Sequence, residues 1–192
     1  MLYTVFDLET TGFDSTRDDV VQLAYTRLDS KLHLVSSGNL YFYYDNMHWS
    51  EEAYAVHKIP QSFLQQHKDS FSENVRTAYA ILQQGNLIGH NCDSFDIPFI
   101  ANFLGRMGTP HVSPRRSFDT MKLFTKSFGK RPKLSDLPKH LDLSERQINF
   151  CLKNCFPDTT DSISFHDARY DVAVTTLAFT TAVIQGLLTL PR

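Results

Sequence analysis

The alternation of apolar and polar residues begins with a short, β-rich segment that ends at an acidic pair. Residues 2–6 are followed by Asp7, Leu8 and Glu9, and then by a turn-like Thr-Thr-Gly at residues 10–12. Successive side chains of a strand point to opposite faces, so Asp7 and Glu9 point the same way and Leu8 enters the opposite layer. The two carboxylates repel each other, which either water or a hard divalent cation would relieve.

Two further strands are predicted before the character of the chain changes. Residues 20–28 form a nearly continuous β-rich run, and a third strand is expected within residues 33–44, where β-formers are concentrated at residues 40–44. The polar segments 14–19 and 29–31 are short connections. Short connections join antiparallel neighbours, so these three strands are predicted to form a meander.

After Asn46 the pattern favours helices. Short helices are predicted over residues 53–59 and 61–67, separated by Pro60, which ends one helix and can open the next. A longer helix is predicted to begin after Ser70 or Ser72 and to reach about Gln84. Its apolar residues recur at helical spacing: Val75, Ala78, Tyr79 and Leu82.

The second half of the chain alternates short strands with helices. Strands are predicted at residues 87–89 and 115–119. Helices are predicted from about Pro98 to Met107 and over residues 120–128, 134–141, 144–155 and 168–188. Three strands followed by this alternation predict one mixed α/β sheet with helices on its faces. We expect residues 1–192 to form a single domain, a length sufficient for a core.

Composition narrows the class of protein. Hydrophobic residues make up 42% and charged residues 21% of the chain, as in soluble globular proteins. The N-terminus has no basic segment before its apolar run, and no uncharged stretch is long enough to span a bilayer, so neither a signal peptide nor a membrane contact is expected. Three cysteines without zinc-site spacing favour reduced thiols in a cytoplasmic protein: Cys92, Cys151 and Cys155.

Charge is distributed unevenly along the chain. The formal net charge is −2, yet residues 115–139 contain eight basic residues and only two acids, Asp119 and Asp136. A basic stretch on an acidic chain is how a phosphate-binding surface can occur in a nearly neutral protein. A solvated helical face is the alternative interpretation of the same residues.

Three separated segments end ordered elements with acids: residues 7–9, 95–96 and 166–171. In the last, His166 and Asp171 are five residues apart, which on one helix would place them roughly 140° apart. They can converge if His166 lies in the loop before the helix, Asp167 caps it and Asp171 is on its second turn. Otherwise His166 is a surface loop residue or a helix cap.

These segments resemble the three motifs of the DEDDh, or DnaQ-like, 3′–5′ exonucleases, in the order that the family has them. The first is Asp-Leu-Glu-Thr-Thr-Gly at residues 7–12, and the second is His90-Asn91 with Phe-Asp-Ile-Pro-Phe at residues 95–99. The third is His-Asp-Ala-Arg-Tyr-Asp at residues 166–171, in which the histidine marks the subclass. Together they extend over nearly the whole chain.

The resemblance implies a ribonuclease-H-like fold, with a mixed five-stranded sheet, three strands antiparallel and then parallel strands, flanked by helices. It also implies two Mg²⁺ or Mn²⁺ ions held by four carboxylates: Asp7, Glu9, Asp96 and Asp171. Oxygen ligands suit such ions, and phosphodiester hydrolysis needs activated water and charge stabilisation on the leaving oxygen. His166 would be the general base, because an imidazole titrates near neutral pH.

The second motif leaves one ligand ambiguous. Four residues separate Asn91 from Asp96, whereas many family members have three; a Trex-like subset has the longer form. Asp93 is therefore a rival of Asp96. We favour Asp96 because it keeps the aromatic-Asp-apolar context, and we expect Asp93 to accept local backbone N–H groups. Asp119 resembles a further family acid and is expected to be structural.

An exonuclease also needs a seat for the 3′ end. By resemblance, Phe13 and Val56 would wedge the terminal nucleotide, with ordinary core packing as the alternative for both. Thr10 and Thr11 could bind the 3′-hydroxyl and Asn91 the nucleic-acid backbone. Lys58 follows His57 where the family often has glycine, which leaves the conformation of that loop open.

The motifs predict a metal-dependent 3′–5′ exonuclease that releases nucleoside 5′-monophosphates from single strands. DNA is slightly favoured over RNA because of the longer second motif. The alternatives are a non-catalytic nucleic-acid-binding or scaffold domain on the same fold, and a proofreading subunit of a polymerase. A freestanding nuclease is expected, with a polymerase or repair partner possible in principle. The sequence predicts no oligomeric state.

Overall fold

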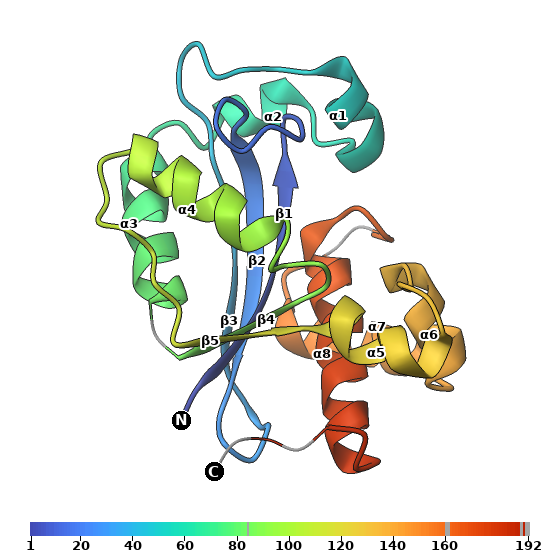
Figure 1. The fold of residues 1–192 in the computed structure, drawn as a ribbon. Helices are drawn as coiled ribbons and strands as arrows, with labels where there is room; N and C mark the ends of the chain where they lie inside the picture. Colours follow the sequence, from blue (N-terminus) through green and yellow to red (C-terminus); the bar gives the residue numbers. More distant parts are fainter. Residues whose placement is uncertain (84, 160–161, 189, 191–192) are drawn as a thin grey trace.

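Five strands form one mixed sheet in the order β3-β2-β1-β4-β5, drawn in Figure 1 from blue to yellow. The computed structural model describes residues 1–83, 85–159, 162–188 and 190. The central strand β1 pairs antiparallel with β2 and parallel with β4; β2–β3 is antiparallel and β4–β5 parallel. This confirms the expected sheet. The strands are β1 (Tyr3–Thr10), β2 (Val20–Leu28), β3 (Leu34–Tyr41), β4 (Asn86–Gly89) and β5 (Arg116–Asp119).

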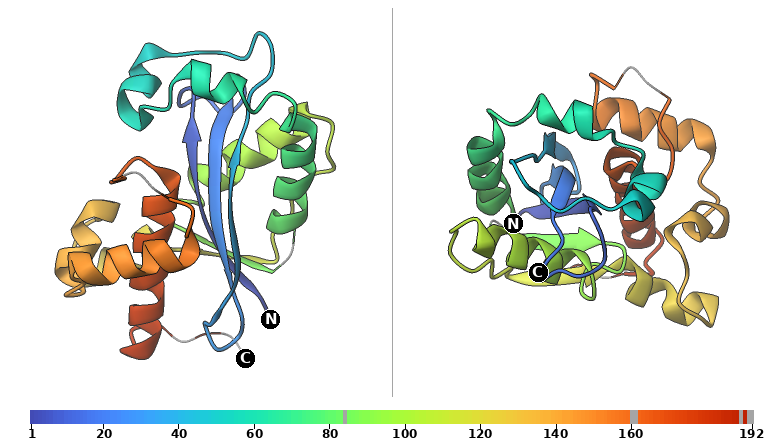
Figure 2. Two further views of the ribbon diagram at one scale, coloured as in Figure 1. Left: turned by 180° about the vertical axis from the view of Figure 1, so that it is seen from behind. Right: turned by 90° about the horizontal axis from the view of Figure 1, so that it is seen from above.

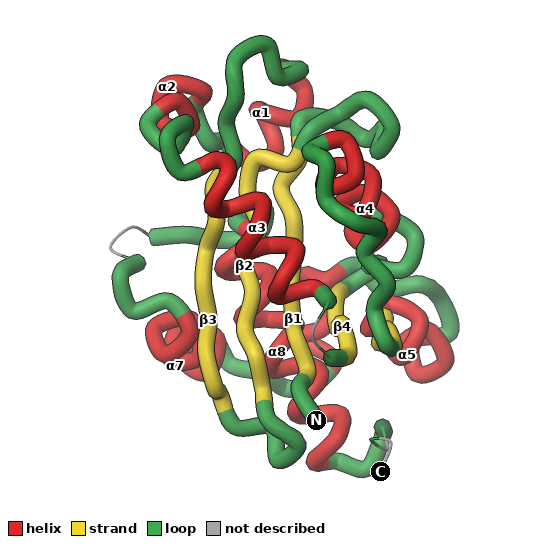
Figure 3. The backbone as a smooth tube through the Cα atoms, turned by 90° about the vertical axis from the view of Figure 1, so that its left-hand side faces the viewer, coloured by secondary structure: helices red, strands yellow, loops and turns green. Residues whose placement is uncertain are grey.

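Helices cover both faces of this sheet, as Figure 3 shows, with α3 in front of the strands and α8 behind them. On one face, α3 (Phe71–Leu82) and α4 (Asp96–Arg106) pack against Phe6 and Leu8 of β1. On the other, α7 (Glu145–Cys155) and α8 (Ala168–Ile184) pack against Tyr3 and Val5 of the same strand. Because successive side chains of β1 point to opposite faces of the sheet, this one strand contributes residues to two separate apolar cores.

Two short helices lie above the end of β1 (Figures 1 and 2). They are α1 (Glu51–His57), which Ser50 caps by accepting the N–H of Ala53, and α2 (Gln61–Gln65), which begins after Pro60. Both agree with the sequence-based expectation. Further along, α5 (Thr120–Phe128) is capped by Asp119, and residues 134–141 divide into a 3-10 turn (Leu134–Asp136) and α6 (Leu137–His140).

The third strand lies within the predicted range of residues 33–44: β3 ends at Tyr41, and Phe42 and Tyr43 are buried beyond it. One predicted helix end is wrong. The last helix was expected to reach Leu188, but α8 ends at Ile184, before the left-handed Gly186. The predicted end of α3 at Gln84 lies outside the described residues.

No helix in the described part of the chain combines the length and apolar character that crossing a membrane requires. Cys92, Cys151 and Cys155 are free, and the sulfur atoms of Cys151 and Cys155 lie 3.9 Å apart on one side of α7.

Candidate active site

Side chains along β1 alternate between the two faces of the sheet, and its two acids lie on the face that α8 covers. Tyr3 and Val5 belong to the core beneath α8, and Asp7 and Glu9 continue the same face toward the end of the strand. Leu8 lies on the opposite face, in the core beneath α3 and α4. The strand therefore holds both carboxylates rigidly, because its apolar neighbours are packed on both sides.

Asp171 reaches the same place from α8. Asp167 caps this helix by accepting the N–H of Arg169 at 3.0 Å, as predicted. Asp171 is the fourth residue of the helix, at the end of the first turn rather than on the second. Carboxylate oxygens of Asp7, Glu9 and Asp171 all lie within 4.8 Å of one another.

Asp96 completes the set from a third element. It is the first residue of α4, is buried, and accepts a backbone hydrogen bond from Leu8, which ties the helix start to β1. It stands outside the close group of three, but its charge raises the pKa of both Asp7 and Glu9. Four carboxylates from β1, α4 and α8 thus line one cleft.

Burial and mutual repulsion oppose ionisation of these four acids. Burial, followed by repulsion from Asp171, Asp96 and Glu9, raises the pKa of Asp7 well above its usual range. Burial, and next Asp171, raises the pKa of Glu9 to about 9. Burial is also the largest cause for Asp96 and Asp171, whose pKa values rise to about 7. A nearby cation would reverse these shifts by favouring the charged forms.

The donor set fits a hard divalent cation. Oδ1 of Asp171 is buried and has no hydrogen-bond partner among the described residues, whereas Oδ2 accepts the N–H of His166 at 3.3 Å. A buried carboxylate oxygen without a donor is costly unless something positive contacts it. The facing oxygens of Asp7 and Glu9 are the hard ligands that Mg²⁺ and Mn²⁺ take.

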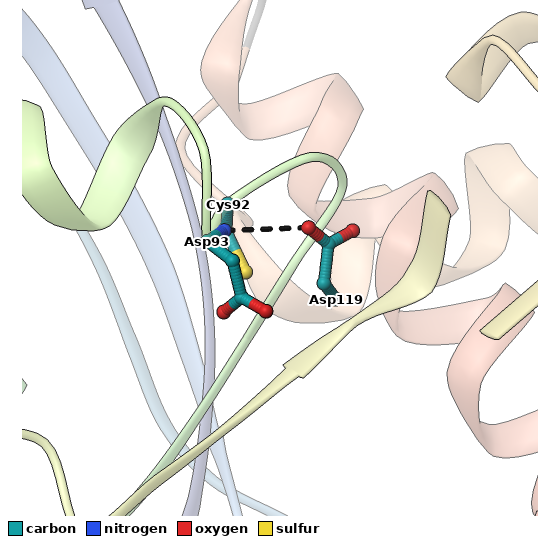
Figure 4. A group of neighbouring side chains, drawn as sticks. All are labelled: Cys92, Asp93 and Asp119. Atoms are coloured by element: carbon teal, nitrogen blue, oxygen red, sulfur yellow. Dashed lines mark hydrogen bonds between the residues drawn. The ribbon is translucent and has the colours of Figure 1, made fainter. Parts of the chain in front are cut away.

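Asp93 and Asp119 lie in a different cluster, shown with Cys92 in Figure 4. Asp119 accepts backbone N–H groups of Asn91 at 2.9 Å, Asp93 at 3.3 Å and Met121 at 3.0 Å. Asp93 pairs with Lys122 at 2.6 Å and does not line the cleft. Asp119 therefore anchors the turn of the second motif. Burial raises the pKa of the Cys92 thiol in this cluster.

His166 lies in the loop immediately before α8, as the spacing predicts. Its backbone is left-handed, with φ 71°, and its side chain is exposed while it lines the cleft beside Asp171. A left-handed residue other than glycine is strained, and such strain persists where surrounding contacts enforce it. Here the enforcing contacts are the Asp171 carboxylate, which receives the His166 N–H, and the capped helix that follows.

The cleft, of about 430 Å³, brings together nearly all of the predicted substrate residues. Phe13 is 84% exposed and its ring is tilted by 59° against that of Phe95, with ring centroids 6.3 Å apart; Val56 is 44% exposed. Neither is a core residue, which removes the packing alternative. Thr10 and Asn91 also line the cleft, but Thr11 does not: it is buried and its hydroxyl accepts the N–H of Asp19.

The turn after β1 is held by two buried acids that the sequence did not single out. Asp18 receives the N–H of Asp14, and Asp19 receives Arg106 at 2.8 Å. A Cβ on Gly12 would come within 2.0 Å of the Asp18 carboxylate, so this position must be glycine because of close approach. These contacts place Phe13 at the mouth of the cleft.

Gln22 was also missed, although it is a polar residue in an apolar strand. It lies opposite Glu9 in the β1–β2 pairing and is fully buried. Its amide donates to Asn39 at 2.9 Å and Asp167 at 3.4 Å, and its carbonyl oxygen accepts the N–H of Ala168 at 3.3 Å. This one side chain connects β2 and β3 to the beginning of α8.

Lys58 keeps the backbone conformation that a glycine would adopt. Its φ is 56°, and its N–H caps α1 by donating to Tyr54 at 2.8 Å. The loop therefore has the left-handed turn despite the departure from the family pattern. The preceding His57 is buried and lines the cleft.

Comparison with known proteins agrees with this arrangement. The family model described as RNase T, exonuclease, matches residues 4–179. No curated protein sequence matches the chain.

Several solved structures share the fold. Escherichia coli exonuclease I in complex with a dA16 oligonucleotide matches with a TM-score of 0.72 at 16% identity, over 97% of this chain and 42% of that one. The zinc-bound E. coli exonuclease I–single-stranded DNA complex gives 0.71 at 17%, over 96% and 40%. The complex with a 5cy-dT13 oligonucleotide gives 0.73 at 14%, over 96% and 40%. The chain thus spans about two-fifths of the length of these proteins.

Replacing Gln22 by Leu should loosen the start of α8, because it removes the amide but keeps a similar volume. Leaving a buried partner unsatisfied costs about 1–3 kcal/mol of unfolding free energy. We expect a lower Tm, faster amide exchange at residues 168–171 and weaker Mn²⁺ binding. Gln185→Leu, at the exposed opposite end of α8, is the matched control. Unchanged exchange at 168–171 would contradict the assigned link.

The raised pKa values predict that the metal-free protein loses stability as pH rises. Glu9, Asp96 and Asp171 keep protons in the folded chain at pH values where they are ionised in the unfolded chain. Stability therefore falls between about pH 4 and 9. Tm should be lower at pH 8.0 than at pH 5.5, less so with Mg²⁺ and less so in Asp171→Asn. An equal drop in parent and variant would show that other groups cause it.

Proposed function

The chain belongs to the RNase T exonuclease family, and from that premise we propose that it removes nucleoside 5′-monophosphates from the 3′ end of single-stranded nucleic acid, with DNA favoured. The observation that carries the proposal is the convergence of four carboxylates and His166, from three elements and one loop, in a single cleft. A non-catalytic scaffold on the same fold has no need for four clustered acids whose pKa values are all raised.

We propose that Asp7, Glu9, Asp96 and Asp171 hold two Mg²⁺ or Mn²⁺ ions. When bound, such ions lower the pKa of the attacking water and stabilise charge on the leaving oxygen. The unpartnered Oδ1 of Asp171 and the close approach of the Asp7 and Glu9 carboxylates support this assignment. The protein's own contribution is rigidity, since β1 and α8 are each packed into a core.

His166 is assigned as the general base. Its exposed imidazole, held at the rim by the contact of its N–H with Asp171, can take the proton of the attacking water. The water oxygen then bonds to phosphorus as the bond to the 3′-oxygen of the preceding nucleotide breaks. The products are a nucleoside 5′-monophosphate and a strand shortened by one residue.

The residues around this centre would provide a seat for the strand. Phe13 and Val56 are exposed apolar groups on the cleft wall, suited to stacking against bases irrespective of sequence. The Thr10 backbone could receive the 3′-hydroxyl, because the Thr10 side chain already donates to Gly12 at 2.7 Å. Thr11 is less suited than the sequence suggested, since its hydroxyl is buried. Asn91, left-handed at φ 63°, could reach the strand backbone.

The choice of DNA rests on two observations. The second motif has the longer, Trex-like spacing, and the E. coli exonuclease I structures that share the fold hold DNA oligonucleotides. We also propose that residues 1–192 act as one exonuclease domain, in the cytoplasm, where the three free thiols would stay reduced. A polymerase or repair partner stays a prediction.

The basic stretch at residues 115–139 divides into two parts in the structure. Arg115 and Arg116 stand at one end of β5, while Asp119 at its other end joins the second motif. The segment of Lys130 and Arg131 adjoins the cleft, because the Pro132 carbonyl oxygen lies 3.1 Å from Nε2 of His90. We propose that Lys130 and Arg131 attract the incoming strand.

A 5′-labelled single-stranded DNA incubated with Mg²⁺ or Mn²⁺ should shorten from its 3′ end in a ladder. EDTA and Asp7→Asn should each abolish the ladder. His166→Ala should lower kcat by roughly 10²–10⁴-fold, the usual contribution of a general base, with little change in metal affinity. An RNA of matched sequence measures the preference. A ladder of equal intensity from Asp7→Asn would refute the proposed chemistry.

Substituting Ala for both Lys130 and Arg131 should raise KM for DNA and reduce its salt dependence, by a slope of about one per lost phosphate contact. Arg115→Ala with Arg116→Ala is the matched control, since it removes the same charge at the other end of β5. Initial rates at several salt concentrations provide the measurement. If both pairs have equal effects, the contribution is general charge rather than a path beside the cleft.

A further inference from the structure

A hollow of about 530 Å³ lies where the end of α5 meets α6, and residues other than those of the cleft line it. We call it the α5–α6 hollow. A small apolar core that includes Phe124, Leu137 and Leu141 joins these helices, which lie on the same side of the molecule in Figure 1. The hollow is lined by Phe128, Lys130, Ser135, Asp136, Lys139 and His140.

Two rings are stacked in this hollow. The ring centroids of Phe128 and His140 lie 3.9 Å apart, and their planes differ by only 28°. Phe128 is half-buried and packs against the small apolar core, whereas His140 is exposed. Phe128 therefore supports one face of the imidazole, and the other side of the ring can be contacted from solvent. A supported aromatic face of this kind is what an unpaired base stacks on, and histidine is among the residues used for it.

Two lysines of the hollow supply positive charge. Lys130 and Lys139 are exposed, and neither forms an ion pair with another residue that the structure describes. The acid of the hollow, Asp136, accepts the N–H of Lys133 at 3.0 Å through Oδ2 and so holds the 3-10 turn. Because each base of a strand is flanked by phosphates, an aromatic face with two unpaired cations matches a nucleotide of a single strand.

The hollow is connected to the cleft through His90, which lines the cleft. Nε2 of His90 lies 3.1 Å from the carbonyl oxygen of Pro132, in the loop that carries Lys130, and Nδ1 lies 3.0 Å from Oγ1 of Thr120 at the start of α5. Phe128 is eight residues further along α5, a distance of about 12 Å at a rise of about 1.5 Å per residue. A stacked strand rises about 3.4 Å per nucleotide, so the hollow is within about four nucleotides of the cleft wall.

We propose that the α5–α6 hollow binds an upstream nucleotide of the single strand whose 3′ end lies in the cleft, an inference that rests on the proposed function. The base of this nucleotide stacks on His140, and Lys130 and Lys139 contact the neighbouring phosphates. Every base has a flat face, so the contact is independent of sequence. A strand that advances by one nucleotide after each cleavage therefore presents an acceptable base to the hollow every time.

The test measures the affinity of labelled single-stranded DNA for altered proteins that all carry Asp7→Asn, so that the strand stays intact. The alterations are His140→Leu, which removes the ring but keeps an apolar cover on the core, His140→Tyr, which keeps a flat ring, and Lys139→Gln. The matched controls are His33→Leu and Lys31→Gln, exposed in the turn between β2 and β3, at the end of β1 opposite the acids. The strands are complete or lack one base, at each position from the second to the eighth nucleotide from the 3′ end.

His140→Leu should bind the complete strand about tenfold more weakly, as expected for the loss of one stacked base. It should also lose the dependence on one upstream base, whose position locates the hollow along the strand, and keep the dependence on the others. His140→Tyr should bind within about twofold of the parent, because its ring still offers a flat face. Lys139→Gln should reduce the slope of log affinity against log salt by roughly 0.7, the value for one phosphate of a single strand. Both controls should bind as the parent does.

Equal affinities of His140→Leu and the parent for every strand would overturn the proposal and leave the stacked pair as a cover of the small core. Equal losses in His140→Leu and His140→Tyr would also overturn it, because the strand would then not contact a ring. Shortening of DNA by the protein with Asp7 intact separates the two proposals. If that protein leaves DNA intact while binding depends on His140 as described, the proposed function fails and the hollow stays assigned; shortening without any effect of His140 refutes the hollow alone.

Discussion

Repulsion among four gathered carboxylates is the constraint on which the structure depends. Burial, and after it the charges of neighbouring acids, raises the pKa values of Asp7, Glu9, Asp96 and Asp171. Such an arrangement is unfavourable by itself and persists only because other contacts enforce it. Those contacts are the two apolar cores on either face of β1, which anchor the sheet, α4 and α8 independently of the acids.

Rigid and strained parts of the site have different tasks. The acids come from regular elements, whereas left-handed residues other than glycine lie around them: Asn91 and His166 line the cleft, and Lys58 ends α1 beside it. Each is enforced by a named contact, the cap of α1, the carboxylate of Asp119, or the carboxylate of Asp171. Fixed acids suit the binding of cations, and an exposed imidazole on a strained loop suits proton transfer.

The acids of the candidate site could be predicted because their spacing repeats a known pattern and because strand alternation places Asp7 and Glu9 on one face. The choice of Asp96 over Asp93 is supported by the pairing of Asp93 with Lys122. Gln22 and His57 could not be found in this way. Gln22 matters because its hydrogen-bond partners Asp167 and Ala168 lie far along the chain. His57 stands out because its buried Nε2 has no hydrogen-bond partner among the described residues.

The sequence by itself determined the mixed sheet, most helix boundaries, the family and the acids, since periodicity, caps and motif spacing are local properties. Only the tertiary structure decided that Phe13 and Val56 are exposed, that Thr11 is buried, and that β3 ends at Tyr41, within its aromatic cluster. It also decided that His140 stacks on Phe128 in a hollow that two lysines line. The burial of a side chain depends on which surfaces pack against each other, and those surfaces come from residues far apart in the chain.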